Sequence, residues 1–124
     1  MQIKLLIVDD SMTMRNRIAR AVNEPRLSNV LIVGMARDGM EAVTLAQEKR
    51  PDIVTMDLTM PNLDGAECIS QMALLLPEVR ILVVSALADK VTAIRAIKRG
   101  AHGFLQKPFD DDGLVEALLE LMKL

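Results

Sequence analysis

The chain has 124 residues, of which 51% are hydrophobic and 26% are charged, and its net charge is −2 at pH 7. This composition is typical of a globular protein and excludes a disordered one, and a single cysteine excludes an internal disulfide. The small net charge gives no general attraction to nucleic acid, and the first apolar run ends at Asp9, too soon for a signal peptide or a membrane span. We therefore expect residues 1–124 to form one cytoplasmic domain that neither binds nucleic acid directly nor inserts into a membrane.

Short apolar runs alternate along the chain with amphipathic stretches. Nearly continuous apolar runs are typical of strands that are covered on both faces of a parallel sheet. Such runs occupy Ile3–Val8, Val30–Met35, Asp52–Met56, Arg80–Val84 and Gly103–Leu105. Apolar residues at helical spacing lie between them, for example at Met14, Ile18, Ala21 and Val22, and at Val91, Ile94 and Ile97. The alternation predicts a doubly wound α/β sandwich of three layers, with five strands and five helices.

Local signals mark the helix boundaries. An acidic N-cap followed three residues later by Glu forms a capping box, acidic residues favour a helix N-terminus, and Gly and Pro are typical of helix ends. These signals predict helix starts at the pairs Asp38/Glu41 and Asp64/Glu67 and at Asp110–Asp112, and helix ends at Pro77 and Gly100.

The last predicted helix carries two neighbouring apolar stripes. A helix that packs on one side needs only one broad apolar face. The second stripe therefore indicates either a surface for a partner or a second copy, or a deep groove against the sheet. The first stripe holds Leu114, Leu118 and Leu121, and the second holds Val115, Leu119 and Met122.

Polar residues follow or end four of the five predicted strands. In an open parallel sheet these carboxyl ends meet at one rim, where ligands bind. The rim collects Asp9 and Asp10, Asp57, Ser85 and Lys107. Three neighbouring carboxylates repel one another unless a cation compensates them, and Mg²⁺ prefers such oxygen ligands. Because a lysine suits a phosphoryl oxygen, the set predicts phosphoryl transfer with an aspartate as the nucleophile.

Four short motifs at these strand ends resemble the receiver domain of bacterial two-component response regulators. The motifs are VDDS at 8–11, MDLTMPNLDG at 56–65, VSA at 84–86 and KPF at 107–109. The resemblance covers essentially the whole chain and is greatest to the stand-alone chemotaxis type. It implies a flavodoxin-like fold in which the strands have the order 2-1-3-4-5.

The resemblance also implies how the acidic residues act. Asp57 would accept a phosphoryl group from a histidine kinase. Asp10, Asp57 and the backbone carbonyl of Thr59 would bind Mg²⁺ directly, with Asp9 acting through a water molecule. A protein of this kind turns over only its own phosphoryl group, so we expect a signalling switch and not an enzyme in the ordinary sense.

The resemblance also implies which residues would bind the phosphoryl group and respond to it. Ser85 would hydrogen-bond it after movement of its loop, and Lys107 would pair with one of its oxygens and precede a cis bond to Pro108. Phe104 takes the place of the switch aromatic, which turns inward when Ser85 moves. The surface formed by the fourth helix, the fifth strand and the fifth helix would then bind a downstream target protein, an output domain or a second phosphorylated copy.

Two further positions bear on how long the phosphoryl group lasts. Thr59 and Leu87 stand where this family controls the access of water to the phosphoaspartate. An apolar Leu87 would exclude the attacking water, so we predict slow autodephosphorylation.

The sequence lacks the motifs of two other classes of protein with an aspartate or a ligand-binding loop after the first strand. A phosphohydrolase of the haloacid dehalogenase kind needs an Asp-x-Asp pattern after the first strand, and a nucleotide or flavin module needs a glycine-rich loop there. The sequence DDSMT at 9–13 has neither.

The segment RPDIVTMDLTMP at 50–61 also resembles the receivers attached to chemotaxis methylesterases. The chain is therefore either a single-domain regulator or a receiver cut from a longer regulator of that sort.

Overall fold

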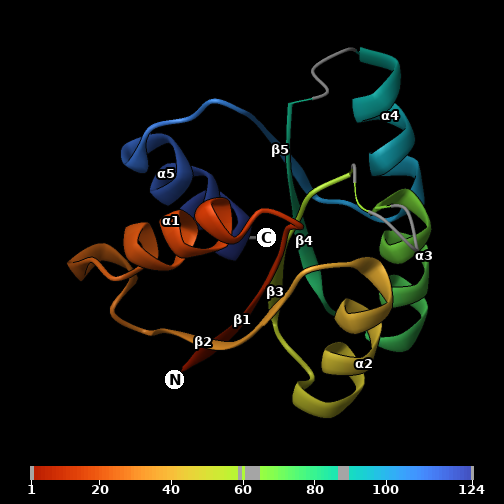
Figure 1. Cartoon of the computed structure of the whole chain (residues 1–124), viewed down its shortest axis with the longest axis horizontal. Helices are drawn as coiled ribbons and strands as arrows, with labels where there is room; N and C mark the ends of the chain where they lie inside the picture. The colour runs from red at the N-terminus through yellow and green to blue at the C-terminus, as the bar shows by residue number, and fades with distance from the viewer. Residues whose placement is uncertain (1, 59, 61–64, 87–89, 124) are drawn as a thin grey trace.

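The computed structural model describes residues 2–58, 60, 65–86 and 90–123, in which five strands alternate with five α-helices and one short 3-10 helix (Figure 1). Each predicted strand is found to within one residue at either end. None of the helices within these residues has the length and apolar character that crossing a membrane requires. The strands are β1 (Ile3–Val8), β2 (Val30–Ala36), β3 (Ile53–Met56), β4 (Arg80–Ser85) and β5 (Gly103–Gln106). The helices are α1 (Met12–Val22), η1 (Pro25–Leu27), α2 (Gly39–Lys49), α3 (Gly65–Leu75), α4 (Lys90–Arg99) and α5 (Asp111–Met122).

The strands form one parallel sheet in the order β2-β1-β3-β4-β5, which confirms the predicted topology. Helices α1 and α5 cover one face of the sheet, and α2, α3 and α4 cover the other (Figure 1). The winding direction reverses between β1 and β3, the two neighbouring strands that are followed by Asp9 and Asp57. Ligands bind at this switch point in doubly wound folds, so the topology itself points to these carboxylates.

The core has two halves, one on each face of the sheet. Successive residues of a strand point to opposite faces. In β1, Leu5 and Ile7 pack in the half beneath α1 and α5, whereas Leu6 and Val8 pack in the half beneath α2 and α3. All four are buried, which explains why β1 is apolar without alternation.

Helix α5 uses both of its apolar stripes in the core. The first stripe is buried, and in the second Val115 is buried while Leu119 and Met122 are partly buried against the same half of the core. The packing of α5 against the sheet therefore agrees with the deep-groove interpretation. A partner surface that includes the partly buried Leu119 and Met122 stays a prediction.

Helix α4 forms where the spacing predicts it, but its apolar stripe does not face the core. Such a stripe ordinarily turns inward. Instead Val91, Ile94 and Ile97 are 64%, 50% and 50% exposed, and Ala96 is the buried residue of the helix, at 2%. Small residues bring this end of α4 close to α3, since a Cβ at Gly100 would lie 3.0 Å from that of Ala73. This approach leaves the larger apolar side chains outside.

The predicted helix caps are present where the structure describes them. A carboxylate oxygen of Asp38 accepts the backbone N–H of Glu41 at 2.8 Å, and the Glu41 carboxylate accepts the N–H of Arg37 at 3.1 Å. At the start of α5, Asp110 accepts the N–H of Gly113 at 2.7 Å. Asp64 lies outside the described residues.

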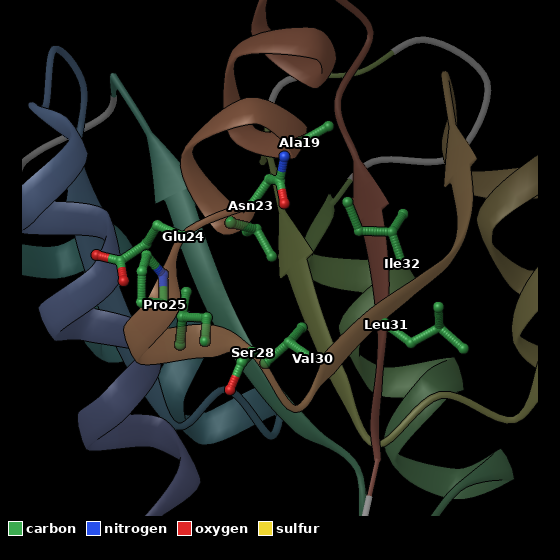
Figure 2. A pocket seen from close by; sticks show the side chains of 10 residues that line it. Ala19, Asn23, Glu24, Pro25, Ser28, Val30, Leu31 and Ile32 are labelled. Atoms are coloured by element: carbon green, nitrogen blue, oxygen red, sulfur yellow. The ribbon is translucent and has the colours of Figure 1, made fainter.

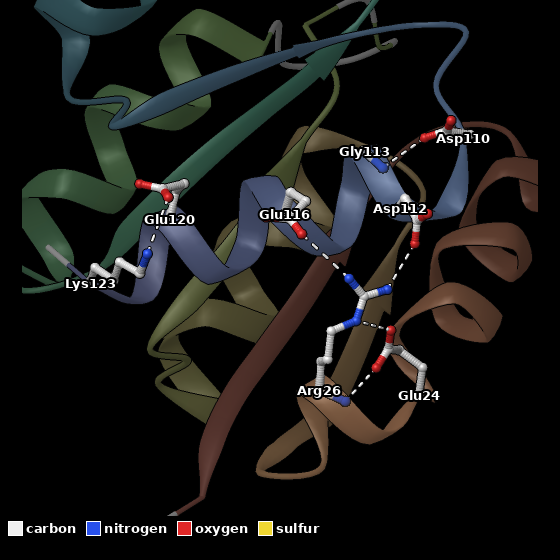
Figure 3. A network of polar contacts seen from close by, with 8 residues as sticks. All are labelled: Glu24, Arg26, Asp110, Asp112, Gly113, Glu116, Glu120 and Lys123. Atoms are coloured by element: carbon white, nitrogen blue, oxygen red, sulfur yellow. Dashed lines mark hydrogen bonds and ion pairs between the residues drawn. The ribbon is translucent and has the colours of Figure 1, made fainter.

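A surface network joins η1 to α5 (Figure 3). The guanidinium of Arg26 contacts the carboxylates of Glu24 at 2.7 Å, Asp112 at 2.8 Å and Glu116 at 3.4 Å. The hydrogen bonds to Asp112 and Glu24 raise the pKa of Arg26. The network ties the connection after α1 to the outer side of α5.

Candidate functional site

The backbone places Asp9 and Asp57 side by side at the carboxyl rim of the sheet. The Asp9 N–H donates to the carbonyl of Ala36, and the Asp57 N–H donates to the carbonyl of Val8, both at 3.0 Å. The hydrogen bonding of the sheet therefore continues one residue past each strand. Asp9 and Asp57 are 1% and 3% exposed, whereas Asp10 is exposed to solvent.

Three carboxylates converge at this rim as the sequence predicts. One oxygen each from Asp9, Asp10 and Asp57 lies within 4.8 Å of the other two. Hard oxygen ligands of this kind suit Mg²⁺, which usually keeps several waters and binds through one or two carboxylates. The exposed Asp10 leaves room for those waters, so the donor set fits the ion. Thr59, the fourth predicted ligand, lies outside the described residues.

Lys107 is the nearby counter-charge. Its Nζ lies 2.8 Å from Oδ2 of Asp9 and 3.9 Å from Oδ2 of Asp57. The lysine side chain is 17% exposed, so this ion pair is largely shielded from water. The peptide bond between Lys107 and Pro108 is cis, as predicted. The ammonium group is thus held between the two buried carboxylates.

Ser85 lies on β4 and Phe104 on β5, the strand that precedes Lys107. Ser85 ends β4 and is buried, and its carbonyl accepts the backbone N–H of Lys107 at 2.9 Å. Phe104 lies on β5, partly buried against the half of the core beneath α3. The roles predicted for Ser85 and Phe104 stay predictions, and Leu87 lies outside the described residues.

Three contacts within the site have no counterpart among the sequence predictions. The N–H of Ser11 donates to Oδ1 of Asp9 at 2.9 Å, and Nη1 of Arg15 donates to the Asp9 carbonyl at 2.7 Å. A Cβ on Gly65 would lie 2.5 Å from the Asp57 carbonyl oxygen, so only glycine fits there. The loop motif includes Gly65, but nothing in the sequence separates Arg15 from the exposed arginine Arg20 on the same helix.

The charged rim is separate from the surface pocket that the structure describes near α1. A surface pocket of about 620 Å³ lies elsewhere, between the end of α1, η1 and the edge strand β2 (Figure 2). Its lining is mainly apolar, with Val22, Leu27 and Ile32 among its walls, and none of the rim carboxylates belongs to it. The chemistry indicated by the charges therefore lies at the rim.

Fold and site together define a doubly wound α/β protein with three carboxylates at one rim of the sheet that could hold a cation, and with an adjacent lysine. Comparison with known families narrows this class. The family described as the response regulator receiver domain matches residues 5–119, and the chain belongs to this family. Its members are signalling modules that interact with histidine kinases and downstream targets and bind Mg²⁺ at an acidic pocket. Membership decides against the phosphohydrolase and nucleotide-binding alternatives.

The chain is similar both to chemotaxis CheY proteins and to the receiver-containing methylesterases that its sequence resembles. The chemotaxis protein CheY of Listeria monocytogenes is 41% identical over 121 residues, which cover 98% of this chain and 99% of that protein. A protein-glutamate methylesterase/protein-glutamine glutaminase of Thermotoga maritima is 39% identical over 108 residues, which cover 86% of this chain and 30% of that protein. The solved CheX–CheY–BeF3–Mg complex from Borrelia burgdorferi matches with a TM-score of 0.90 and 29% identity, over 97% of this chain and 89% of that chain.

Proposed function

We propose that residues 1–124 form one receiver domain that accepts a phosphoryl group from a histidine kinase on Asp57 and acts as a signalling switch in chemotaxis. The observation that carries the proposal is the meeting of Asp9, Asp10 and Asp57 within 4.8 Å, with Nζ of Lys107 at 3.9 Å from Asp57. A carboxylate beside a cation site and an ammonium group can act as a phosphoryl acceptor. The pathway rests on the similarity to CheY proteins.

In the proposed reaction, an oxygen of Asp57 attacks the phosphorus of a phosphohistidine. The P–O bond forms as the P–N bond breaks, and the leaving imidazole nitrogen takes up a proton. Asp10, Asp57 and the carbonyl of Thr59 would hold Mg²⁺ directly, and Asp9 would hold it through water. Bound there, Mg²⁺ would supply positive charge that offsets the negative charge of the phosphoryl oxygens.

Lys107 and Ser85 bind the product in this proposal. The ammonium group of Lys107 leaves Asp9 and pairs with a phosphoryl oxygen, and the Ser85 hydroxyl donates to another. The 2.9 Å bond between the Lys107 N–H and the Ser85 carbonyl couples the ends of β4 and β5. Movement of Ser85 is therefore passed to β5, where Phe104 turns inward.

The proposed output surface is formed by α4, β5 and α5. Exposed Val91, Ile94 and Ile97 support it, because large apolar side chains at half exposure or more favour a binding surface. The occupant is a target protein, an output domain or a second phosphorylated copy. Slow autodephosphorylation and the cytoplasmic location stay predictions.

Intact-protein mass tests the phosphorylation directly, since the sequence holds no Trp for a fluorescence readout. The protein is incubated with acetyl phosphate and Mg²⁺. We expect one added phosphoryl group, which is lost in EDTA and in Asp57→Asn. Asp111→Asn, an exposed aspartate at the start of α5, is the matched control and keeps the adduct. Absence of the adduct in the native protein would contradict the proposal.

Amide NMR tests the output surface. Phosphorylation is expected to shift the signals of α4 and β5 as well as those near Asp57. Shifts confined to the rim would contradict the proposed surface. Ile94→Glu is expected to prevent any phosphorylation-dependent dimer measured by light scattering, whereas Leu74→Glu, at an 85% exposed position on α3, leaves it unchanged. A time course of the adduct in the same samples measures the autodephosphorylation rate.

A further inference from the structure

Helix α1 reaches the site loops through two arginines that bind carbonyl groups. Nη1 of Arg15 donates to the Asp9 carbonyl at 2.7 Å, and Nη2 of Arg17 donates to the Phe109 carbonyl. Both are partly buried. Both hydrogen bonds are made to backbone carbonyl groups rather than to side chains. They fix the backbone of the segments that carry Asp9 and Lys107.

The Arg17 contact is double. Besides its hydrogen bond to the Phe109 carbonyl, its guanidinium lies over the Phe109 ring, with Cζ 4.6 Å from the ring centroid. Such cation–π stacking adds attraction and fixes the ring relative to the cation. Phe109 is itself buried in the half of the core beneath α1 and α5. Arg17 thus joins α1 to Phe109, at the end of the segment that follows β5.

Residues 107–109 are therefore held at both ends. The Lys107 N–H is bonded to the Ser85 carbonyl at 2.9 Å, and Phe109 is bonded to Arg17. The side chain that leaves this short span reaches Asp9 with Nζ at 2.8 Å. The distance from Nζ to Oδ2 of Asp57 is 3.9 Å, which is close to the limit for an ion pair. A small displacement of residues 107–109 would therefore separate the ammonium group from Asp57.

We propose that Arg17 is a positioning residue for phosphoryl transfer, which acts by holding residues 107–109 so that the Lys107 ammonium group stands between Asp9 and Asp57. The inference rests on the proposed function, because it assigns Arg17 a part in that reaction. It requires that the effect of Arg17 pass through Lys107. A residue that only stabilises the fold would not meet this requirement.

Three variants separate placement from packing. Arg17→Met keeps the linear side chain over the Phe109 ring but removes the donors and the charge, whereas Arg17→Lys keeps a donor and the charge. Arg20→Met is the control, since Arg20 is exposed on the same helix. We expect the phosphorylation rate with acetyl phosphate to fall about tenfold in Arg17→Met, as reactive groups lose alignment. Arg17→Lys is expected to recover most of the rate, and Arg20→Met to leave it unchanged.

A double-mutant cycle with Lys107→Met tests whether the effect passes through Lys107. In saturating Mg²⁺, Arg17→Met is expected to cause no further loss of rate once Lys107 is replaced. The same fold loss in both backgrounds would overturn the proposal, as would a native rate in folded Arg17→Met. Circular dichroism verifies that each variant is folded.

NMR of the lysine ammonium groups gives a readout that needs no phosphorylation. In the native protein the Lys107 signal, assigned with Lys107→Arg, is expected to exchange its protons slowly because the group is shielded and bonded to Asp9. Arg17→Met is expected to speed this exchange, and Arg20→Met is not. If the native protein takes no phosphoryl group, the proposed function fails and this measurement still tests the placement of Lys107. Unchanged exchange in Arg17→Met would overturn the inference by itself.

Discussion

Two basic residues of this protein each face more than one carboxylate, and they differ in burial. Lys107 lies between Asp9 and Asp57 with 17% of its side chain exposed, whereas the Arg26 side chain is 44% exposed among Glu24 and two acidic residues of α5. The exposed network has more contacts (Figure 3). Water and salt screen its charges, and exposed pairs contribute little to stability. We therefore expect burial, rather than the number of ion pairs, to decide how much each network contributes to the stability of the fold.

Removal of the buried cation is expected to have the largest effect. Lys107→Met leaves the buried carboxylates of Asp9 and Asp57 without their counter-charge, so we expect the free energy of unfolding in EDTA to fall by about 3 kcal/mol. Urea denaturation followed by circular dichroism measures it. Added Mg²⁺ is expected to restore more stability to this variant than to the native protein. If the variant were as stable as the native protein in EDTA, the buried ion pairs of Lys107 would not stabilise the fold as expected.

A buried polar group without a partner extends the same comparison. Thr55 is 1% exposed in the middle of β3, and its hydroxyl has no hydrogen-bond partner within the described part of the chain. Thr55→Val removes a hydroxyl that lost its water on folding, so we expect a gain of about 1 kcal/mol. The Tm and the urea midpoint are both expected to rise. A loss of stability would mean that the hydroxyl is bonded after all.

A smaller effect is expected at the opposite rim, where His102 is tied to β4. The Nδ1 atom of His102 accepts the backbone N–H of Ile81 at 3.2 Å, and the backbone N–H of His102 donates to the Ile81 carbonyl at 2.8 Å. Burial, and to a lesser degree the charge of Arg80, lowers the pKa of His102 below its usual value near 6.5. As the pH falls through 6.5, the unfolded chain binds the proton more readily than the folded chain, so stability decreases on acidification.

The measurement is the urea midpoint as a function of pH, in the native protein and in His102→Gln. The native midpoint is expected to decrease more steeply below pH 6.5 than that of the variant. The nearby charged residues Asp52, Glu78 and Glu120 are present in both proteins, so their titration cancels in the difference. Equal slopes would show that the imidazole does not titrate with folding.

The smallest effect is expected from the network with the most ion pairs. Arg26→Met removes all three contacts to Glu24, Asp112 and Glu116, but each of these groups regains water. The urea midpoint is expected to change too little to rank beside the other variants, and added NaCl is expected to reduce even that difference. A loss as large as that of Lys107→Met would refute the ranking by burial.

The sequence predicts the strands and the rim residues because both depend on short local patterns. An apolar run of three to six residues predicts each strand, and parallel pairing then brings the residues after β1 and β3 together whatever the details of the helices. Spacing also placed α4, but it could not show that Ile94 and Ile97 face outward. That orientation depends on how closely α4 approaches α3, which small residues on both helices decide.

The contacts of Arg15 and Arg17, and the surroundings of the Thr55 hydroxyl, could not be predicted because they also depend on tertiary packing. Periodicity identifies the face of α1 that carries Ile18, but it does not say that arginines at its margin reach carbonyl groups of two separate loops. Likewise, Thr55 in the run IVTM looks like any β-branched strand residue. Whether its hydroxyl finds a partner depends on neighbours that are distant in the sequence.

The outward orientation of α4 affects the free energy that is needed to detach this helix from the rest of the protein. Helix α5 is anchored by four buried side chains, Leu114, Val115, Leu118 and Leu121, whereas α4 has the buried Ala96 alone. Little apolar surface is exposed when α4 detaches, so it should open in amide hydrogen exchange at a much lower free energy than α5 does. Helices α4 and α5 lie on opposite faces of the sheet, and we expect α4 to be displaced at a free energy that leaves α5 folded.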